Sequence, residues 1–180
     1  IVQSLVGSEM CIRDRIRKIA VNTCKKINYK GLGTFEFLYE DGNFYFIEMN
    51  TRLQVEHTIT EMITGIDLVK LQIMIAAGQE IPLSQEDINC RGHAIECRIN
   101  AEHHETFIPS PGKVTEFHPP GGFRIRTDSH LYSGYTVPQY YDALIAKICA
   151  HSSDRISAIR KMRVAPVSYT HLTLPTTSKV

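Results

Sequence analysis

Hydrophobic and polar positions along this chain follow two different periods, which predict where helices and strands form. Between 16 and 27, apolar side chains recur every three to four positions, as on the buried face of a helix. Between 33 and 50, apolar and polar side chains alternate, as in half-buried strands. The whole pattern predicts helices over 16–27, 58–65, 68–77 and 154–163, and strands over 33–40, 44–50 and 93–100. We therefore expect a fold of the α+β class.

The texture of the sequence changes after Pro82, where glycine and proline begin to separate short predicted strands. We place a boundary between two units near 80–90, giving a first unit over 16–88 and a β-rich second unit over 89–165. The segments 1–15 and 166–180 show no sustained period, and both resemble translated adapter sequence. We expect them to be non-native; ordinary frayed termini are the alternative.

Asp41, Gly42 and Asn43 separate the two strands predicted between 33 and 50 and are typical of a hairpin loop. A two-residue loop would mix polar and apolar side chains on both faces of the hairpin, so we favour a three-residue loop. One face is then uniformly apolar and should be buried, because it pairs Phe35 with Met49, Phe37 with Ile47 and Tyr39 with Tyr45. The other face pairs Thr34 with Asn50, Glu36 with Glu48, Leu38 with Phe46 and Glu40 with Phe44.

The predicted pairing of Glu36 with Glu48 places two carboxylates directly opposite each other, which destabilises a hairpin unless something compensates. A bound cation is one means of compensation. Asn50 adds an amide oxygen to the same face, and carboxylate and amide oxygens suit a hard cation such as Mg²⁺. The pattern thus predicts a metal site at Glu36, Glu48 and Asn50, with a solvated sheet face as the alternative.

Residues 48–57 read Glu-Met-Asn-Thr-Arg-Leu-Gln-Val-Glu-His and continue the polar alternation beyond the hairpin. In an extended backbone, Arg52, Gln54 and Glu56 would point the same way as the proposed metal ligands. The planar guanidinium of Arg52 suits a small planar anion such as bicarbonate, and Glu56 could act as a base on that anion. A surface segment with an Arg–Glu ion pair is the alternative.

The composition of the chain excludes few functions, but it limits the kinds of partner that the chain is expected to bind. With 20 basic and 19 acidic residues, the chain has no net field that would attract nucleic acid or an anionic membrane. Its longest apolar runs are far shorter than the roughly 20 residues of a membrane span. The five cysteines form no C-x-x-C pair, so we expect reduced thiols in a cytoplasmic protein.

Several motifs in a fixed order resemble biotin carboxylase, the enzyme that uses ATP and bicarbonate to carboxylate biotin. They cover about 16–165 and read GTFEF, EMNTRLQVEH, GHAIECRINAE, PSPGKV, GGFRIR, DSHLYSGYTVPQYYDALIAK and RISAIRKM. The resemblance implies the C-terminal part of an ATP-grasp domain followed by the β-rich biotin carboxylase C-terminal domain. It also implies the first half-reaction of acetyl-CoA carboxylase in fatty acid synthesis, or of a propionyl-CoA, pyruvate or other carboxylase.

The resemblance assigns roles to individual residues. It implies that Glu36, Glu48 and Asn50 bind Mg²⁺ or Mn²⁺ beside ATP, with Leu38 near the adenine. It implies that Arg52, Gln54 and Val55 bind bicarbonate, that Glu56 is the general base, and that Arg98 stabilises the biotin enolate. By the alternation alone, Arg98 only shares a strand face with Glu96 and Asn100. Phe123 and Arg126 match positions of the family's homodimer interface.

The resemblance also implies partners and a missing part. Biotin would arrive on a carboxyl carrier protein, and a carboxyltransferase would complete the reaction. The chain lacks a glycine-rich phosphate loop, so we expect it to be a fragment that is inactive alone. The alternatives are another ATP-grasp ligase, such as half of a carbamoyl-phosphate synthetase, and a remnant that only binds. The Arg-Leu-Gln-Val-Glu-His continuation and the C-terminal motifs argue against the other ligase.

Overall fold

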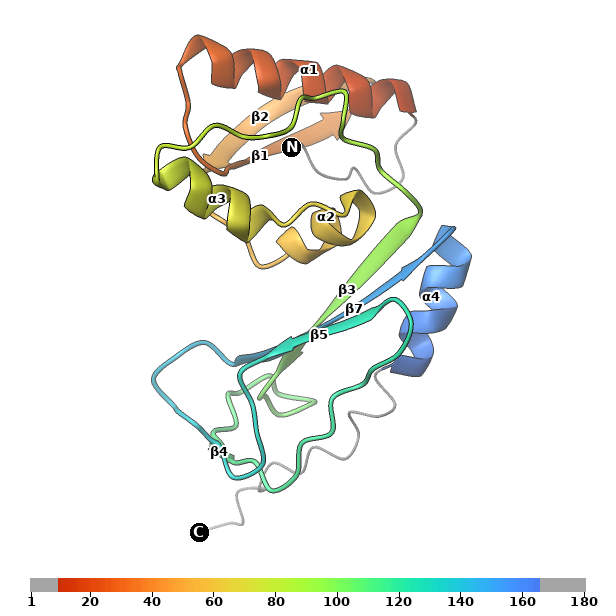
Figure 1. Cartoon of the computed structure of the whole chain (residues 1–180). Helices are drawn as coiled ribbons and strands as arrows, with labels where there is room; N and C mark the ends of the chain where they lie inside the picture. Colours follow the sequence, from red (N-terminus) through yellow and green to blue (C-terminus); the bar gives the residue numbers. More distant parts are fainter. Residues whose placement is uncertain (1–9, 166–180) are drawn as a thin grey trace. The chain divides into compact units, whose positions relative to one another are not determined.

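The computed structural model of this chain describes residues 10–165 and divides into two compact units, with the division between Cys90 and Arg91 (Figure 1). Both units mix helices and strands, which confirms the predicted α+β class. We describe each unit separately. The expectations for 1–9 and 166–180 concern residues outside the described range.

The described part of unit 1 contains three helices and one hairpin. The first helix starts earlier than expected, at Met10 rather than Ile16, so it extends into the segment predicted to be non-native. It ends before Asn28, whose φ of 50° lies in the left-handed region that stops a helix. The elements are α1 (Met10–Lys26), β1 (Thr34–Glu40), β2 (Asn43–Asn50), α2 (His57–Thr64) and α3 (Leu68–Ala76).

The two short helices of unit 1 begin and end at residues that the sequence marks. Helix α2 ends at Gly65, whose φ of 72° and ψ of 17° give a left-handed cap. The Asp67 carboxylate caps α3 by accepting a hydrogen bond from the Lys70 backbone N–H at 2.8 Å. The Glu61 carboxylate accepts another from the Leu68 N–H at 2.8 Å, so a side chain of α2 holds the start of α3.

The register of the hairpin differs from the prediction near its loop. The strands pair Glu40 with Asn43, so the loop has two residues, and both take positive φ, 46° at Asp41 and 81° at Gly42. Two-residue loops with this geometry match the twist of the flanking strands. A bulge then shifts the register between Glu36 and Phe37 and leaves Ile47 outside the pairing.

Because of the bulge, three of the seven predicted pairs are correct and four are wrong. Thr34 with Asn50, Phe35 with Met49 and Glu36 with Glu48 are confirmed, whereas Phe37 pairs with Phe46, Leu38 with Tyr45 and Tyr39 with Phe44. The apolar face is therefore made by Met49 and five aromatic residues whose rings contact one another, Phe35, Phe37, Tyr39, Phe44 and Phe46. Ile47, expected to be buried, is 52% exposed because it is the bulged residue. Phe35, Phe37 and Met49 are half-buried rather than buried.

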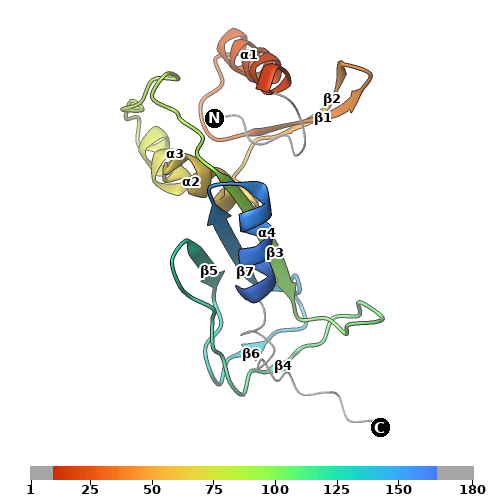
Figure 2. The same cartoon turned by 90° about the vertical axis from the view of Figure 1, so that its right-hand side faces the viewer.

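Unit 2 is built on a three-stranded antiparallel sheet with the order β3-β7-β5, and its helix α4 packs against β3 and β7 (Figure 2). The central strand is almost entirely buried, which explains its nearly continuous apolar sequence. The elements are β3 (His93–Asn100), β4 (Gly112–Lys113), β5 (Ile125–Ser129), β6 (Thr136–Val137), β7 (Leu144–Ser152) and α4 (Arg155–Val164).

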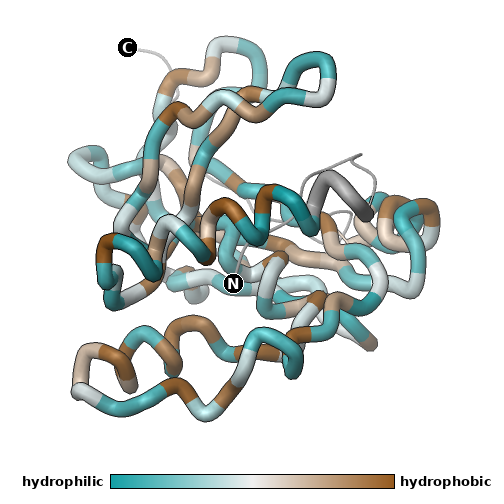
Figure 3. The backbone as a smooth tube through the Cα atoms, turned by 90° about the horizontal axis from the view of Figure 1, so that it is seen from above, coloured by the Kyte–Doolittle hydropathy of each residue, from teal (hydrophilic) through white to brown (hydrophobic). Residues whose placement is uncertain are grey.

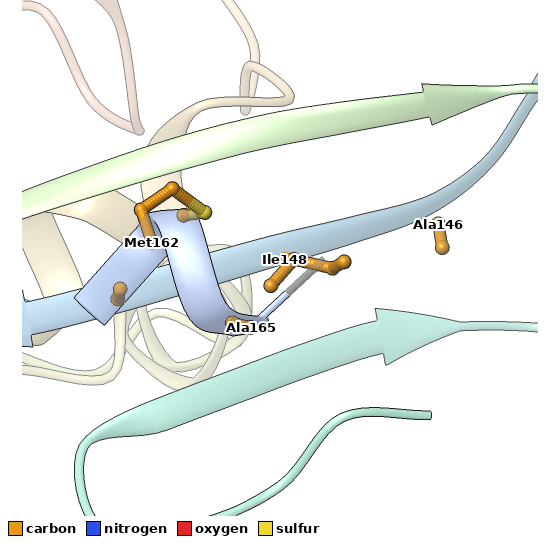
Figure 4. Close-up of a cluster of buried hydrophobic side chains, with 5 residues drawn as sticks. Ala146, Ile148, Met162 and Ala165 are labelled. Carbon is orange, nitrogen blue, oxygen red and sulfur yellow. The ribbon is translucent and has the colours of Figure 1, made fainter. Parts of the chain in front are cut away.

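The core of unit 2 lies between this sheet and α4. Ala146, Ile148 and Ala150 of β7 pack with Met162 and Ala165 (Figure 4). A second cluster joins Val114, Val137, Leu131, Ala101 and Ile145 beneath the loops. Asp154 caps α4 by accepting a hydrogen bond from the Ser157 N–H at 2.8 Å, as the predicted helix start requires.

Hydrophobic stretches are short throughout the described chain, and hydrophilic residues interrupt them repeatedly (Figure 3). Among residues 10–165, no helix has the length and apolar character needed to cross a membrane.

Candidate functional site

The hairpin brings Glu36 and Glu48 together as direct cross-strand partners. Amide N–H groups hold the two carboxylates in place. Asn50 Nδ2 donates to Glu36 Oε1 at 2.8 Å and to Glu48 Oε1 at 3.0 Å, and Gln54 Nε2 donates to Glu36 Oε1 at 3.2 Å. These hydrogen bonds place amide donors between the two carboxylates and so offset part of the repulsion between the two glutamates.

Arg52 lies beside this carboxylate cluster. One guanidinium nitrogen, Nη2, donates to Asn50 Oδ1 at 3.5 Å, and Nη1 donates to the Leu53 carbonyl at 3.3 Å. The side chain is exposed, so its N–H groups face a region that a small anion can enter. Glu36, Glu48, Asn50, Arg52 and Gln54 thus form one connected set, which we call the hairpin site.

The predicted polar alternation ends at Gln54. Val55 and Glu56 form a turn, and Glu56 takes the N-cap position of α2 with φ −79° and ψ 6°. The extended row expected to reach Glu56 is therefore wrong at its last member. The turn is fixed by His57, whose backbone N–H and ring Nδ1 lie 3.2 and 2.7 Å from the Gln54 carbonyl oxygen.

One polar atom of the hairpin site is left unsatisfied. Within the described part of the chain, Gln54 Oε1 is buried and has no hydrogen-bond partner. A buried carbonyl oxygen without a donor is costly, so a ligand that brings an O–H or N–H group to this point would be favoured.

The donor set of the hairpin site fits a hard divalent cation. It offers two carboxylates and one amide, which are the oxygen donors that Mg²⁺ and Mn²⁺ take, with waters and phosphate oxygens as further ligands. Asn50 would have to turn its amide to present Oδ1, because Nδ2 now faces the carboxylates. Among the described residues, no group of three or more His, Cys, Asp or Glu side chains could hold a metal ion.

The other predicted residue of the hairpin is Leu38, which lies across β1–β2 from Tyr45 and is 62% exposed. Together with the bulged Ile47, these side chains give the hairpin an exposed apolar surface two positions along β1 from Glu36. An exposed apolar surface of this kind suits the flat face of a heterocyclic base. The sequence pattern of these residues does not differ from that of residues in a hydrophobic core.

Arg98, predicted on a strand face with Glu96, lies on β3 in unit 2. Its Nε is 3.7 Å from Glu96 Oε1, and the Arg98 side chain is about half exposed while that of Glu96 is nearly buried. The Cys149 thiol also donates to Glu96, at 3.7 Å from Oε2. A half-exposed guanidinium next to a nearly buried carboxylate is a charged donor of the kind that binds anions in proteins.

A row of charges that the sequence argument missed runs across the same sheet. The register places Lys147 of β7 between Arg98 of β3 and Asp128 of β5. Lys147 Nζ is 3.7 Å from Asp128 Oδ2, and Arg126 binds the same carboxylate with two hydrogen bonds of 2.7 and 2.8 Å. The mostly apolar sequence of Leu144–Ser152 is typical of a buried strand, in which Lys147 stands out as a charged residue. Its partners on the neighbouring strands can be identified only from the tertiary fold.

Phe123 and Arg126 lie in and just after the turn that precedes β5. Phe123 is 80% exposed, whereas Arg126 is half-buried in its pair with Asp128. Arg98, Phe123 and Arg126 belong to unit 2, and the hairpin site belongs to unit 1.

Comparison with known proteins indicates to which of the predicted enzyme families this chain is related. A family model described as "Carbamoyl-phosphate synthase L chain, ATP binding domain" matches residues 9–84, and one described as "Biotin carboxylase C-terminal domain" matches 96–178. The biotin carboxylase of Allochromatium vinosum is 61% identical over 150 residues, which cover 83% of this chain and 33% of that protein. This chain is a homologue of the biotin carboxylases. It spans about a third of the length of the curated biotin carboxylases that it matches.

Solved biotin carboxylase structures agree with the fold. A biotin carboxylase from Campylobacter jejuni, described as a complex with beta-gamma-ATP, superimposes with a TM-score of 0.87 at 48% identity, covering 92% of this chain and 37% of that one. The biotin carboxylase domain dimer of the Hydrogenobacter thermophilus 2-oxoglutarate carboxylase, with MgADP, ADP and bicarbonate, gives 0.86 at 46% identity, covering 89% and 36%. The similarity extends over both units, so the expected biotin carboxylase ATP-grasp architecture is confirmed.

Proposed function

We propose that this chain carries the C-terminal part of a site that uses ATP and bicarbonate to carboxylate biotin on a carrier protein. The observation that carries the proposal is the hairpin site. A cross-strand pair of glutamates, an asparagine, an arginine and a glutamine with an unsatisfied oxygen converge in a chain homologous to biotin carboxylases. A metal, a nucleotide phosphate and a small anion would each find suitable donors there.

In this proposal the oxygens of Glu36, Glu48 and Asn50 hold Mg²⁺ or Mn²⁺, which would neutralise charge on the ATP phosphates. Leu38 packs near the adenine. The Gln54 side chain is a further bicarbonate contact, while Arg52 binds the anionic oxygens, so the single bicarbonate O–H is left for Glu56. The backbone N–H of Val55 is a further contact to bicarbonate.

Glu56 accepts the bicarbonate proton as general base in this proposal. Arg98 stabilises the negative charge that develops on the ureido oxygen of biotin, and Glu96 holds its guanidinium in position. Both roles require charged side chains directed at the reacting groups.

The proposed partners follow from the chemistry. Biotin reaches the site on a biotin carboxyl carrier protein or domain, and a carboxyltransferase passes the carboxyl group to its final acceptor. We propose a homodimer formed on the side of Phe123 and Arg126, and a cytoplasmic location. The acceptor is acetyl-CoA in our first proposal, with propionyl-CoA or pyruvate as the alternative.

We further propose that the 180-residue chain does not turn over ATP by itself. Phosphoryl transfer depends on positioning and charge neutralisation, and the hairpin site contributes metal ligands without a glycine-rich loop over the phosphates. A test is phosphate release by the purified chain with ATP, Mg²⁺, bicarbonate and free biotin. Release clearly above that of a Glu56→Ala control would contradict this part of the proposal.

The metal site has a direct test that needs no turnover. Mn²⁺ binding to the chain can be followed by the loss of its free-ion electron paramagnetic resonance signal. Glu48→Gln should weaken binding by at least about tenfold, because even outer partners of metal ligands contribute that much. Glu40→Gln removes the same charge from the same hairpin and should change binding little. Equal affinities in the two variants would reject the hairpin site as a metal site.

A further inference from the structure

The turn that carries Phe123 presents an aromatic ring to solvent with little packing to hold it. Phe123 is 80% exposed, and the preceding Gly122 and following Arg124 take φ of 132° and 62°. A turn with two positive φ values and an adjacent Gly121 has many accessible conformations when nothing restrains it. An exposed ring of this kind needs an external restraint to stay in one orientation.

Lys161 of α4 supplies that restraint. Its Nζ donates to the Phe123 carbonyl and to the His151 carbonyl, each at 3.1 Å, and lies 5.6 Å from the centre of the Phe123 ring. An ammonium group has three N–H donors. Two are used by carbonyl oxygens from different segments, and the third can face the ring. Lys161 therefore ties the turn, the end of β7 and α4 together.

The neighbouring contacts fix the flanks of the turn rather than Phe123 itself. The His151 N–H donates to the Arg124 carbonyl at 3.0 Å, and the Thr127 hydroxyl donates to the Pro120 carbonyl at 2.9 Å. Arg124 places its guanidinium 5.1 Å from the centre of the Phe123 ring. The ring thus lies beside two cations, which makes this small apolar surface electropositive.

We infer that Lys161 is a positioning residue that holds Phe123 as a preformed anchor for a second copy of the chain, an inference that rests on the proposed homodimer. Aromatic side chains flanked by arginine are common anchors of protein interfaces. Fixing such an anchor before association removes part of the entropy cost of ordering it. The two cations predict that the second copy places carboxylates opposite this ring.

Limited chymotrypsin digestion tests the clamp whether or not the chain dimerises. Cleavage after Phe123 is measured by mass spectrometry relative to cleavage after Tyr141, which is 80% exposed in another loop. Lys161→Met should raise this ratio about tenfold, the factor expected from losing hydrogen bonds to a charged donor. Arg163→Met, which removes an exposed cation from the same helix, should leave the ratio unchanged. Lys161→Arg, which keeps a charged donor, should restore most of the protection.

Analytical ultracentrifugation over a dilution series then tests whether a second copy of the chain binds at Phe123. Lys161→Met and Phe123→Ala should both weaken self-association of the full chain, and Arg163→Met should not. An unchanged cleavage ratio in Lys161→Met, or an equal rise at Phe123 and Tyr141, would overturn the clamp. If the clamp holds but Phe123→Ala associates like the unsubstituted chain, the proposed dimer surface is wrong and Phe123 does not anchor a second copy.

Discussion

The two units differ in how completely they bury their own apolar residues. In unit 2, Val114, Ile145, Ile148 and Cys149 are fully enclosed by the sheet, its loops and α4. Among the described residues, unit 1 buries four apolar residues, Ile16, Ala20, Leu68 and Leu71, whereas unit 2 buries twelve. Large apolar side chains of the hairpin instead face solvent: Leu38, Tyr39, Tyr45, Phe46 and Ile47.

Because of this difference, the better-packed unit is not the unit that carries the hairpin site. Unit 2 has a core in which β7 packs against α4, and its sheet also carries Arg98 and the charges around Lys147. Unit 1 carries the hairpin site, but among residues 10–90 its sheet has two strands, and an isolated hairpin is marginally stable in water. The part that we propose to bind ATP and bicarbonate is thus the part that most needs further surface to cover it.

The largest expected effect concerns the core of unit 2. Ile148→Ala should lower the free energy of unfolding of that unit by about 2–5 kcal/mol, because the side chain is fully buried and leaves a cavity. Ile47→Ala, at the exposed bulge of unit 1, should change stability by less than about 0.5 kcal/mol. Urea unfolding followed by circular dichroism measures both. Comparable losses would show that the two units are equally well packed.

One arginine from each unit tests whether both contribute to the same reaction. In a full-length carboxylase containing this segment, Arg52→Ala and Arg98→Ala should each reduce turnover by about 10²–10³, the usual effect of losing one donor to developing charge. The affinity for ATP should change little. Near-normal bicarbonate-dependent ATP cleavage in the Arg52 variant would remove that residue from the proposed site.

A smaller effect with a defined pH dependence is expected at the start of α4. The hydrogen bond from the Ser157 N–H, and then that from its hydroxyl, lower the pKa of Asp154 below its ordinary value of 3.8. A lowered pKa means that Asp154 stabilises unit 2 above the unfolded-state pKa, and that this contribution is lost as pH falls through the folded-state pKa.

Asp154→Ala should therefore lower the urea midpoint of unit 2 at pH 7, and the gap to the unsubstituted chain should close as the pH falls through that acidic range. Asp67→Ala provides the matching cap of α3 in unit 1. A gap that stays constant down to low pH would contradict the role of the Asp154 charge.

The smallest effect is a difference in rate between two thiols. Burial, and then the nearby Glu96 charge, raise the pKa of Cys97 above its ordinary value of 9.0, whereas Cys90 is exposed. Because the thiolate is the reactive form, iodoacetamide should modify Cys90 before Cys97 at pH 7.5, as followed by peptide mass spectrometry. Faster modification of Cys97 would show that β3 opens more readily than the packing of unit 2 suggests.

Local chemistry alone fixed the ends of several elements. Asp67 and Asp154 cap helices that begin where the sequence predicted them, and Gly65, the last position of its predicted helix, ends α2 in a left-handed conformation. His93–Asn100 forms the strand predicted from its alternation. Each of these features depends on interactions within a few positions along the chain, which a single sequence displays.

The similarity to biotin carboxylases was equally visible, because several motifs in a fixed order carry it, and the comparisons confirm the homology. The pairing of Glu36 with Glu48 was also predicted correctly, although through a loop of the wrong length. A three-residue loop and a two-residue loop followed by one bulged residue give the same register beyond the bulge. The apolar alternation determined the total number of residues in the loop and the bulge together. The preference of Asp-Gly for a two-residue turn placed two of them in the loop and left one for the bulge.

The tertiary structure determined what depends on neighbours distant in sequence. Whether Lys147 lies between Arg98 and Asp128 follows from the order of three strands, and no local period contains that order. The same is true of Lys161, which reaches Phe123 across 38 positions of sequence. Periodicity predicts which face of a helix or strand a side chain lies on. Which residue it contacts there depends on how whole helices and strands pack. The contacts that position Arg98 and Phe123 depend on such packing.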